Sequence, residues 1–182
     1  MKIEYKNFYH FYNRTINREP AFPQKRNYLY FLEKYKTYVS PYVTTHAYVL
    51  MPTHFHFLIE IQTREPEKLL KNIGIFLGSY ATAINRAINR HGSLFQAHSQ
   101  AKHIDDTDYL INVLNYIHQN PVRRNLVSRL DDWIYSSYPD LSGQRNGTLP
   151  SRDLINPLFN NKQEFIEFSK EMMTEIRSKY WV

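Results

Sequence analysis

The spacing of hydrophobic residues changes several times along the chain between a period of two and a period of three to four. A period of two is typical of strands, whose successive side chains point to opposite faces, and the longer period is typical of amphipathic helices. The alternating segments predict strands at 7–14, 42–51, 54–62 and 93–104. The longer period predicts helices at 24–39, 67–91 and 107–119.

The ends of these elements carry turn-forming residues. Met51-Pro52-Thr53 is typical of a tight hairpin turn between the second and third strands. Gly92 can cap the second helix, and Asn120-Pro121 is expected to end the third. The first six elements follow the order strand, helix, strand, strand, helix, strand, which matches the split β-α-β, ferredoxin-like pattern.

An α+β fold follows, with an antiparallel sheet that carries two helices on one face. The third helix is the long element left to cover the other face. Beyond residue 127 the pattern is weaker, with a short packing segment at 131–139, a linker at 142–150 and a helix at 162–179. We therefore expect a main domain over residues 1–145, followed by a linker and C-terminal helical extension over 146–182.

Composition narrows the class of partner. The chain has 182 residues, 42% of them hydrophobic, which is enough for one domain with a real core. Its 15 tyrosines, 11 phenylalanines and net charge of +6 give a basic, aromatic-rich chain. Single-stranded nucleic acid favours such a surface, because cations meet phosphates and rings stack on bases.

Several chemistries and locations are excluded or disfavoured. The chain has no cysteine, so disulfides, thiolate zinc sites and cysteine nucleophiles are excluded. No apolar run approaches the length of a membrane span, and the first six residues lack the apolar core of a signal peptide. We expect a cytoplasmic protein with no membrane partner.

The strand at 54–62 carries a candidate metal site. His54 and His56 are two residues apart and share one face of the strand, while Phe55 and Phe57 share the other. If the phenylalanines face the first two helices, the histidines face the third. A pair of strand histidines more often has an ordinary structural explanation, as half-buried residues with polar partners.

The third helix could complete that site. Tyr116 and Asn120 are four residues apart and therefore neighbours on one helix face. Two imidazoles and one amide oxygen would hold a divalent ion and leave positions open for substrate. Tyr116 alone is as readily a core aromatic residue, and Asn120 a helix-ending residue.

Together these stretches resemble a known family, the HUH single-tyrosine transposases, and most closely the bacterial REP-associated tyrosine transposases. The two main matching stretches are Y-V-L-M-P-T-H-F-H-F-L-I at 48–59 and Y-I-H-Q-N-P-V-R-R-N-L-V at 116–127. Shorter similarities are H-F-Y-N-R at 10–14, S-L-F-Q at 93–96 and W-I-Y-S-S-Y at 133–138. The resemblance covers about residues 8–142.

The resemblance implies a DNA transposase that cuts and rejoins single-stranded DNA folded into hairpins. It implies His54, His56 and Asn120 as ligands of Mg²⁺ or Mn²⁺, and Tyr116 as the nucleophile that forms a 5′-phosphotyrosine. Relatives often carry glutamine where Asn120 stands. Some relatives are homodimers that exchange the tyrosine helix and others act as monomers, so the resemblance is compatible with either state.

Two departures from the family pattern affect the expected DNA contacts. Gln96-Ala97-His98 stands where relatives often have Gln-Gly-Arg, and Asn125 stands where they often have glycine. Asparagine tolerates the left-handed conformation that glycine would adopt there. The candidates for phosphate contacts, chosen because they flank the site in sequence, are Arg14, Lys102, Arg123 and Arg124.

Two other functions compete with strand transfer. A domesticated relative would bind structured single-stranded DNA or RNA without cutting it, although such a module has no need of the histidines and the tyrosine. A metal hydrolase of small phosphoesters would use water in place of Tyr116. A covalent protein–DNA adduct distinguishes strand transfer from both.

Overall fold

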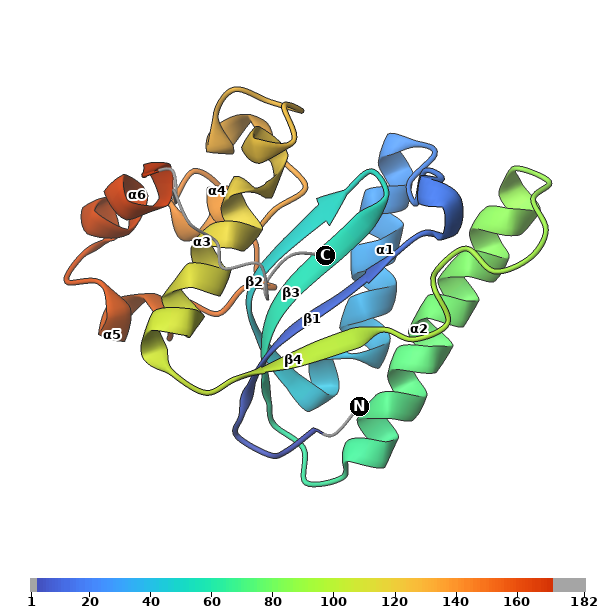
Figure 1. Ribbon diagram of the computed structural model, residues 1–182, viewed down its shortest axis with the longest axis horizontal. Coiled ribbons are helices and arrows are strands. Elements are labelled where there is room, and N and C mark those ends of the chain that lie inside the picture. Colours follow the sequence, from blue (N-terminus) through green and yellow to red (C-terminus); the bar gives the residue numbers. More distant parts are fainter. Residues whose placement is uncertain (1–2, 172–182) are drawn as a thin grey trace.

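A four-stranded antiparallel sheet forms the centre of the molecule and carries helices on both faces (Figure 1). The computed structural model describes residues 3–171. In spatial order the strands are β2 (Val43–Met51), β3 (His54–Ile61), β1 (Phe8–Arg14) and β4 (Gln100–Ile104). The α+β, ferredoxin-like class is therefore confirmed.

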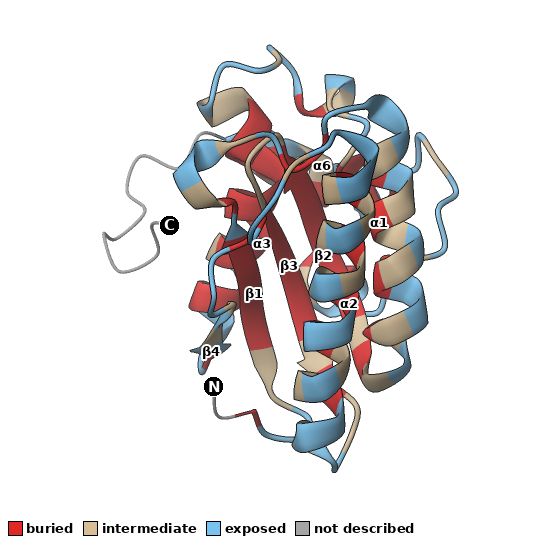
Figure 2. Ribbon diagram, turned by 90° about the vertical axis from the view of Figure 1, so that its right-hand side faces the viewer, coloured by how far each residue is buried: buried red, intermediate tan, exposed pale blue. Residues whose placement is uncertain are grey.

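The two faces of the sheet have separate cores. Helices α1 (Lys25–Tyr38) and α2 (Pro66–Ala87) cover one face, and α3 (Thr107–Arg123) covers the other, so that buried strands lie between the two layers (Figure 2). Phe55 and Phe57 belong to the α1–α2 core, where the Phe57 ring stacks 4.1 Å from Tyr35. The alternation of β3 therefore directs its histidines toward α3, as the sequence predicts.

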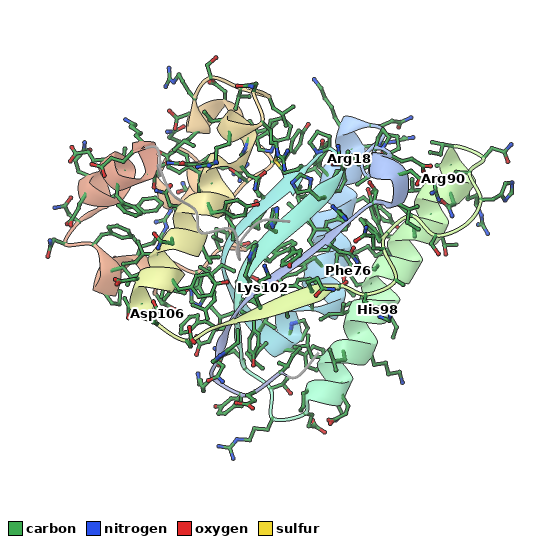
Figure 3. All side chains as sticks on the ribbon, viewed as in Figure 1. Arg18, Phe76, Arg90, His98, Lys102 and Asp106 are labelled. Atoms are coloured by element: carbon green, nitrogen blue, oxygen red, sulfur yellow. The ribbon has the colours of Figure 1, made fainter. Side chains whose placement is uncertain are left out.

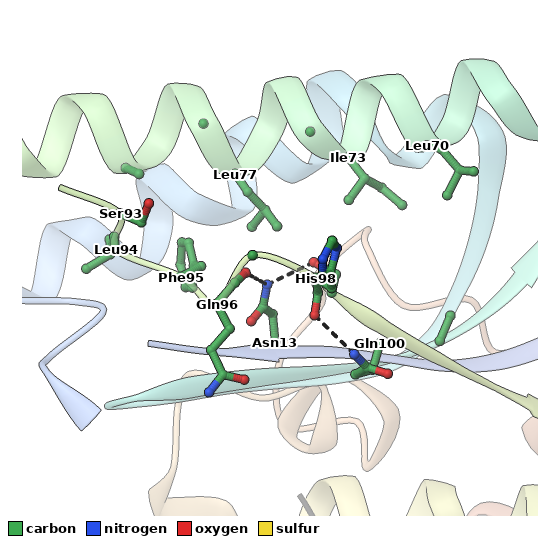
Figure 4. Close-up of a pocket in the computed structure, with 16 residues that line it drawn as sticks. Asn13, Leu70, Ile73, Leu77, Ser93, Leu94, Phe95, Gln96, His98 and Gln100 are labelled. Atoms are coloured by element: carbon green, nitrogen blue, oxygen red, sulfur yellow. Dashed lines mark hydrogen bonds between the residues drawn. The ribbon is translucent and has the colours of Figure 1, made fainter. Parts of the chain in front are cut away.

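The predicted strand at 93–104 is found as a strand only from Gln100, where β4 begins, and of its earlier residues Phe95 makes an isolated antiparallel bridge to Thr15. Asn13 explains the shortening, because its Nδ2 donates to Gln96 O (3.1 Å) and to Ser99 Oγ (2.9 Å) (Figure 4). These bonds hold residues 96–99 in a loop instead of a ladder. A groove of about 560 Å³ lies between this loop and α2.

Two helix ends differ from the prediction. Helix α2 ends at Ala87, and Asn89 takes the left-handed φ of 52° just beyond it, ahead of the predicted Gly92 cap. Helix α3 continues through Pro121 to Arg123. A proline in the final turn gives up one backbone hydrogen bond, and the Pro121 ring is buried. Asn125 then takes the expected left-handed conformation, with φ of 55°.

The chain after α3 packs against the open edge of β2 and the outer side of α3. Residue Ser136 bridges to Val49, and Leu50 N donates to Tyr135 O (2.9 Å). Three short helices follow the edge segment: α4 (Tyr138–Leu141), α5 (Ile155–Leu158) and α6 (Lys162–Lys170). The predicted helix at 162–179 is found as far as Lys170, and its residues from 172 lie outside the described chain. The division at residue 145 stays a prediction.

Single-turn 3-10 helices complete the structure: η1 (Ile16–Arg18), η2 (Ser40–Tyr42) and η3 (Leu130–Asp132). Among residues 3–171, no helix is long and apolar enough to cross a membrane.

Candidate active site

The two histidines of β3 lie on the face of the sheet that α3 covers. In the antiparallel register His54 stands opposite Arg14 and His56 opposite Tyr12 of β1. Directly opposed residues share a face, so β1 contributes a cation and a ring to the same surface. His56 is fully buried, while His54 lies nearer the end of the sheet and is partly exposed.

Helix α3 brings the predicted tyrosine and asparagine to these histidines. The Tyr116 ring stands nearly perpendicular to the His56 ring, with 5.3 Å between centroids. One helical turn later, Asn120 Oδ1 lies 3.4 Å from His54 Nε2. The four residues predicted from spacing therefore meet in one place within a single chain.

The neighbouring amide, Gln119, points elsewhere. Its Nε2 donates to Ser169 O (3.1 Å) and to the carbonyl of Glu171, both at the end of α6. Consecutive helical residues differ by about 100° in direction, so the two amides cannot face the same way. Asn120 is thus the amide at the site, and Gln119 fastens α6 to α3.

Ser137 fixes how α3 sits on the sheet. Its hydroxyl accepts from Tyr48 N (2.9 Å), donates to Tyr48 O (3.2 Å) and accepts from His118 Nε2 (2.8 Å). One hydroxyl thereby joins β2 to α3, two residues along the helix from Tyr116. All three groups are buried, so none has water as a substitute partner.

His10 is a functional candidate that the sequence interpretation missed. It is buried on β1, and its Nε2 lies 2.9 Å from His56 Nδ1. Its ring centroid is also 5.9 Å from that of Tyr116. The sequence does contain one indication of this position, because His10, Tyr12 and Arg14 are two residues apart along a predicted strand and must therefore share a face.

Burial keeps the imidazoles neutral. It is the main cause that lowers the pKa of His10 to about 3 and of His54 to about 4, with smaller contributions from neighbouring cations. The pKa of His56 is likewise held well below its usual value. Burial raises the pKa of Tyr116, while a hydrogen bond from Asn120 and the charges of Arg124 and Arg123 act in the opposite direction.

The donor set fits a divalent ion. His56 Nε2 is buried and has no hydrogen-bond partner among residues 3–171, so its lone pair is available there, and its Nδ1 already has His10 as partner. His54 Nδ1 is engaged by Thr53 Oγ1 at 3.1 Å, which leaves Nε2 for an ion. No cluster of three or more histidine or acidic side chains able to hold a metal occurs within residues 3–171. An ion here would depend on two imidazoles, the Asn120 amide and the substrate.

The four candidate phosphate contacts lie at three places. Arg14 and Arg124 line one pocket beside His54. Lys102 lies on β4 opposite His10, with its Nζ 5.7 Å from the centroid of the Tyr12 ring (Figure 3). Arg123 is in the last turn of α3, near enough to Tyr116 for its charge to oppose, in small part, the rise in the pKa of Tyr116 that burial causes. All four lie around the site, and their contacts with DNA stay a prediction.

Comparison with known proteins identifies a solved structure of similar architecture. The chain is similar to a REP-associated tyrosine transposase bound to a REP hairpin, over 98% of this chain and 94% of that chain. The TM-score is 0.59 and the sequence identity is 15%. No protein-family model and no curated protein matches the chain. The likeness concerns the fold: the chain has the fold of a REP-associated tyrosine transposase, as the sequence resemblance predicts.

Proposed function

We propose that this protein is a transposase-type enzyme that cuts and rejoins single-stranded DNA folded into hairpins. Tyr116 is the nucleophile, and His54, His56 and Asn120 hold a divalent ion, Mg²⁺ or Mn²⁺. The observation that carries the proposal is the convergence of Tyr116 on two neutral histidines, the fully buried His56 and the partly exposed His54, with an amide oxygen one turn away. A structural tyrosine needs none of these neighbours.

The side chains divide the reaction between them. The phenol oxygen of Tyr116 attacks the phosphorus, the bond to the 3′-oxygen breaks, and the phenolic proton is lost while the released 3′-oxygen gains one. A divalent ion, when bound, polarises the phosphate and neutralises charge on its oxygens. His54, His56 and Asn120 would hold the ion as neutral ligands, so they would not cancel the positive charge that it offers to the phosphate. The phosphotyrosine conserves the bond energy, so a 3′-hydroxyl can later reverse the step.

His10 acts through His56. When an ion takes the lone pair on His56 Nε2, the proton of that imidazole must reside on Nδ1, where His10 Nε2 accepts it at 2.9 Å. Such a partner fixes both the tautomer and the ring orientation of a metal-binding histidine. His10 is therefore a positioning residue for the site.

The decisive experiment uses a pool of labelled hairpin oligonucleotides with single-stranded flanks of randomised sequence, incubated with protein and Mn²⁺. We expect the wild-type protein to give a denaturation-resistant protein–DNA band, and Tyr116→Phe to give none while still binding DNA. Tyr28→Phe is the matched control, because Tyr28 is a buried tyrosine on the other face of the sheet.

Each other outcome identifies a different function. An adduct of unchanged yield in Tyr116→Phe would remove Tyr116 as the nucleophile. Binding without any adduct in the wild-type protein would favour a module that binds structured nucleic acid. Cleavage with no adduct would favour a hydrolase that uses water.

A further inference from the structure

A small basic pocket opens at the end of the sheet, directly beside His54. It has a volume of about 260 Å³. Three arginines line it, Arg14 from the end of β1, Arg18 from η1 and Arg124 from the end of α3. The sequence interpretation did not single out Arg18. Figure 3 shows Arg18 where the chain leaves β1.

The loop that carries Arg18 is held in a strained conformation. Asn17 and Arg18 both have left-handed φ values, 55° and 57°. For a residue such as arginine this costs about 1–2 kcal/mol, and strain of this kind persists where surrounding contacts impose it.

Those contacts are present at the base of the loop. Thr15 N and Oγ1 both donate to Thr53 O, at 2.8 and 3.0 Å. Thr15 Oγ1 also lies 2.6 Å from Glu19 O. Ala21 N donates to Pro52 O (2.7 Å), so the loop is tied on both sides to the turn between β2 and β3. These hydrogen bonds hold the loop, and with it Arg18, beside His54, which follows the turn.

No ion pair within the described residues neutralises the positive charge of the pocket. No aspartate or glutamate lines it, and within residues 3–171 no ion pair joins a carboxylate to Arg14, Arg18 or Arg124. Glu19, adjacent to Arg18, is instead paired with Arg90 at 2.5 Å. Three like charges around one small cavity repel one another, and an anion between them removes that repulsion.

We propose that this pocket binds a backbone phosphate of the DNA strand, one that neighbours the scissile phosphate. The inference rests on the proposed function, because His54, which lines the pocket, then marks the scissile position. Arginine suits the task, since its planar fork matches phosphate oxygens, and exposed Leu126 at the rim offers an apolar surface to the sugar. A phosphate held here positions the strand for attack by Tyr116.

The test measures binding in EDTA, where no cleavage interferes. The probe is a hairpin oligonucleotide with a single-stranded flank of randomised sequence, and its Kd is followed against NaCl concentration. For Arg18→Ala we expect about tenfold weaker binding, the order of one charge-assisted hydrogen bond, and a salt slope lower by about 0.7. Arg18→Lys should keep most of the slope, and Arg26→Ala, an exposed arginine of α1, should match wild type.

Phosphate neutralisation then locates the contact. In a set of oligonucleotides, each with one methylphosphonate, the modification at one position should weaken binding to the wild-type protein and leave binding to Arg18→Ala unchanged. Either of two results would overturn the pocket as a phosphate site. One is an unaltered Kd and salt slope in Arg18→Ala. The other is that Arg18→Ala and the methylphosphonate weaken binding additively at every position of the oligonucleotide.

The two proposals fail separately. A Tyr116 adduct with normal DNA binding by Arg18→Ala rejects the pocket and keeps the enzyme. A lowered salt slope without any adduct keeps the pocket and rejects the enzyme.

Discussion

At the scale of single residues, the site depends on which of two adjacent amides faces the histidines. Asn120 lies 3.4 Å from His54 Nε2, whereas Gln119 bonds to carbonyl groups of α6. The two residues have the same functional group, so their difference in role comes from direction alone. Substituting each in turn separates coordination from packing.

We expect Asn120→Ala to lower Mn²⁺ affinity at least about tenfold, measured by electron paramagnetic resonance with bound hairpin DNA in a Tyr116→Phe background. Gln119→Ala should keep the affinity and lose about 1–3 kcal/mol of unfolding free energy, because carbonyl groups of α6 lose a buried donor. Equal losses of affinity in the two variants would mean that Asn120 acts only on stability.

The residue-level predictions succeeded where a period determines direction. His54 and His56 share a face because they are two apart in a strand, and Tyr116 and Asn120 because they are four apart in a helix. His10 and Arg18 were missed for a different reason. Their partners lie 46 and 36 positions away in sequence. The alternation of β1 places His10 on the histidine face but does not identify its partner, and Arg18 lies in a loop that has no period.

At the scale of elements, the strands and long helices were predictable because each has a strong period, whereas their ends were set by distant contacts. Asn13 shortened β4 by binding residues 96–99, and packing carried α3 past Asn120-Pro121. The rotation of α3 about its own axis was equally beyond the sequence pattern. Ser137 is one of the contacts that set it, and it lies 19 residues from its helical partner and 89 from its partner in β2.

Ser137→Ala should therefore destabilise the protein by about 1–3 kcal/mol in urea unfolding, because Tyr48 N and His118 Nε2 lose a buried partner. Ser142→Ala is the control: Ser142 is also buried, but its hydroxyl makes one long bond, 3.4 Å to Pro139 O, and Gln144 N and Arg145 N also donate to that carbonyl. If the two variants lose the same free energy, Ser137 does not orient α3.

At the scale of the whole molecule, four neutral histidines lie on α3 or beside it. His10, His54 and His56 lie between the sheet and α3, His118 lies between α3 and the chain that follows it, in contact with Ser137 and Phe165, and burial lowers the pKa of each. In the unfolded chain these imidazoles titrate near pH 6.5. Below about pH 6.5 the unfolded state therefore binds more protons than the folded state. The contribution of these histidines to the free energy of unfolding is fully present above about pH 6.5 and is lost as the pH falls toward the pKa values of the folded state.

We expect the free energy of unfolding, measured by urea titration in EDTA, to fall from about pH 7 to about pH 5, a window in which most carboxylates stay ionised. Each histidine contributes at most about 1.4 kcal/mol per pH unit. His118→Gln should give a flatter profile, because the glutamine amide can still donate to Ser137 Oγ but cannot be protonated. A profile as steep as that of the wild-type protein would remove His118 from the acid response.

The position of α3 over its own sheet has a consequence for molecularity. One polypeptide supplies both the tyrosine and its histidines, so under the proposed chemistry the cut is first order in the protein–DNA complex. Diluting the protein then slows encounter with DNA and leaves the cutting step unchanged. Each chain has one tyrosine at the site and holds one severed end at a time. Exchange between two DNA sites at once therefore requires a second protein molecule.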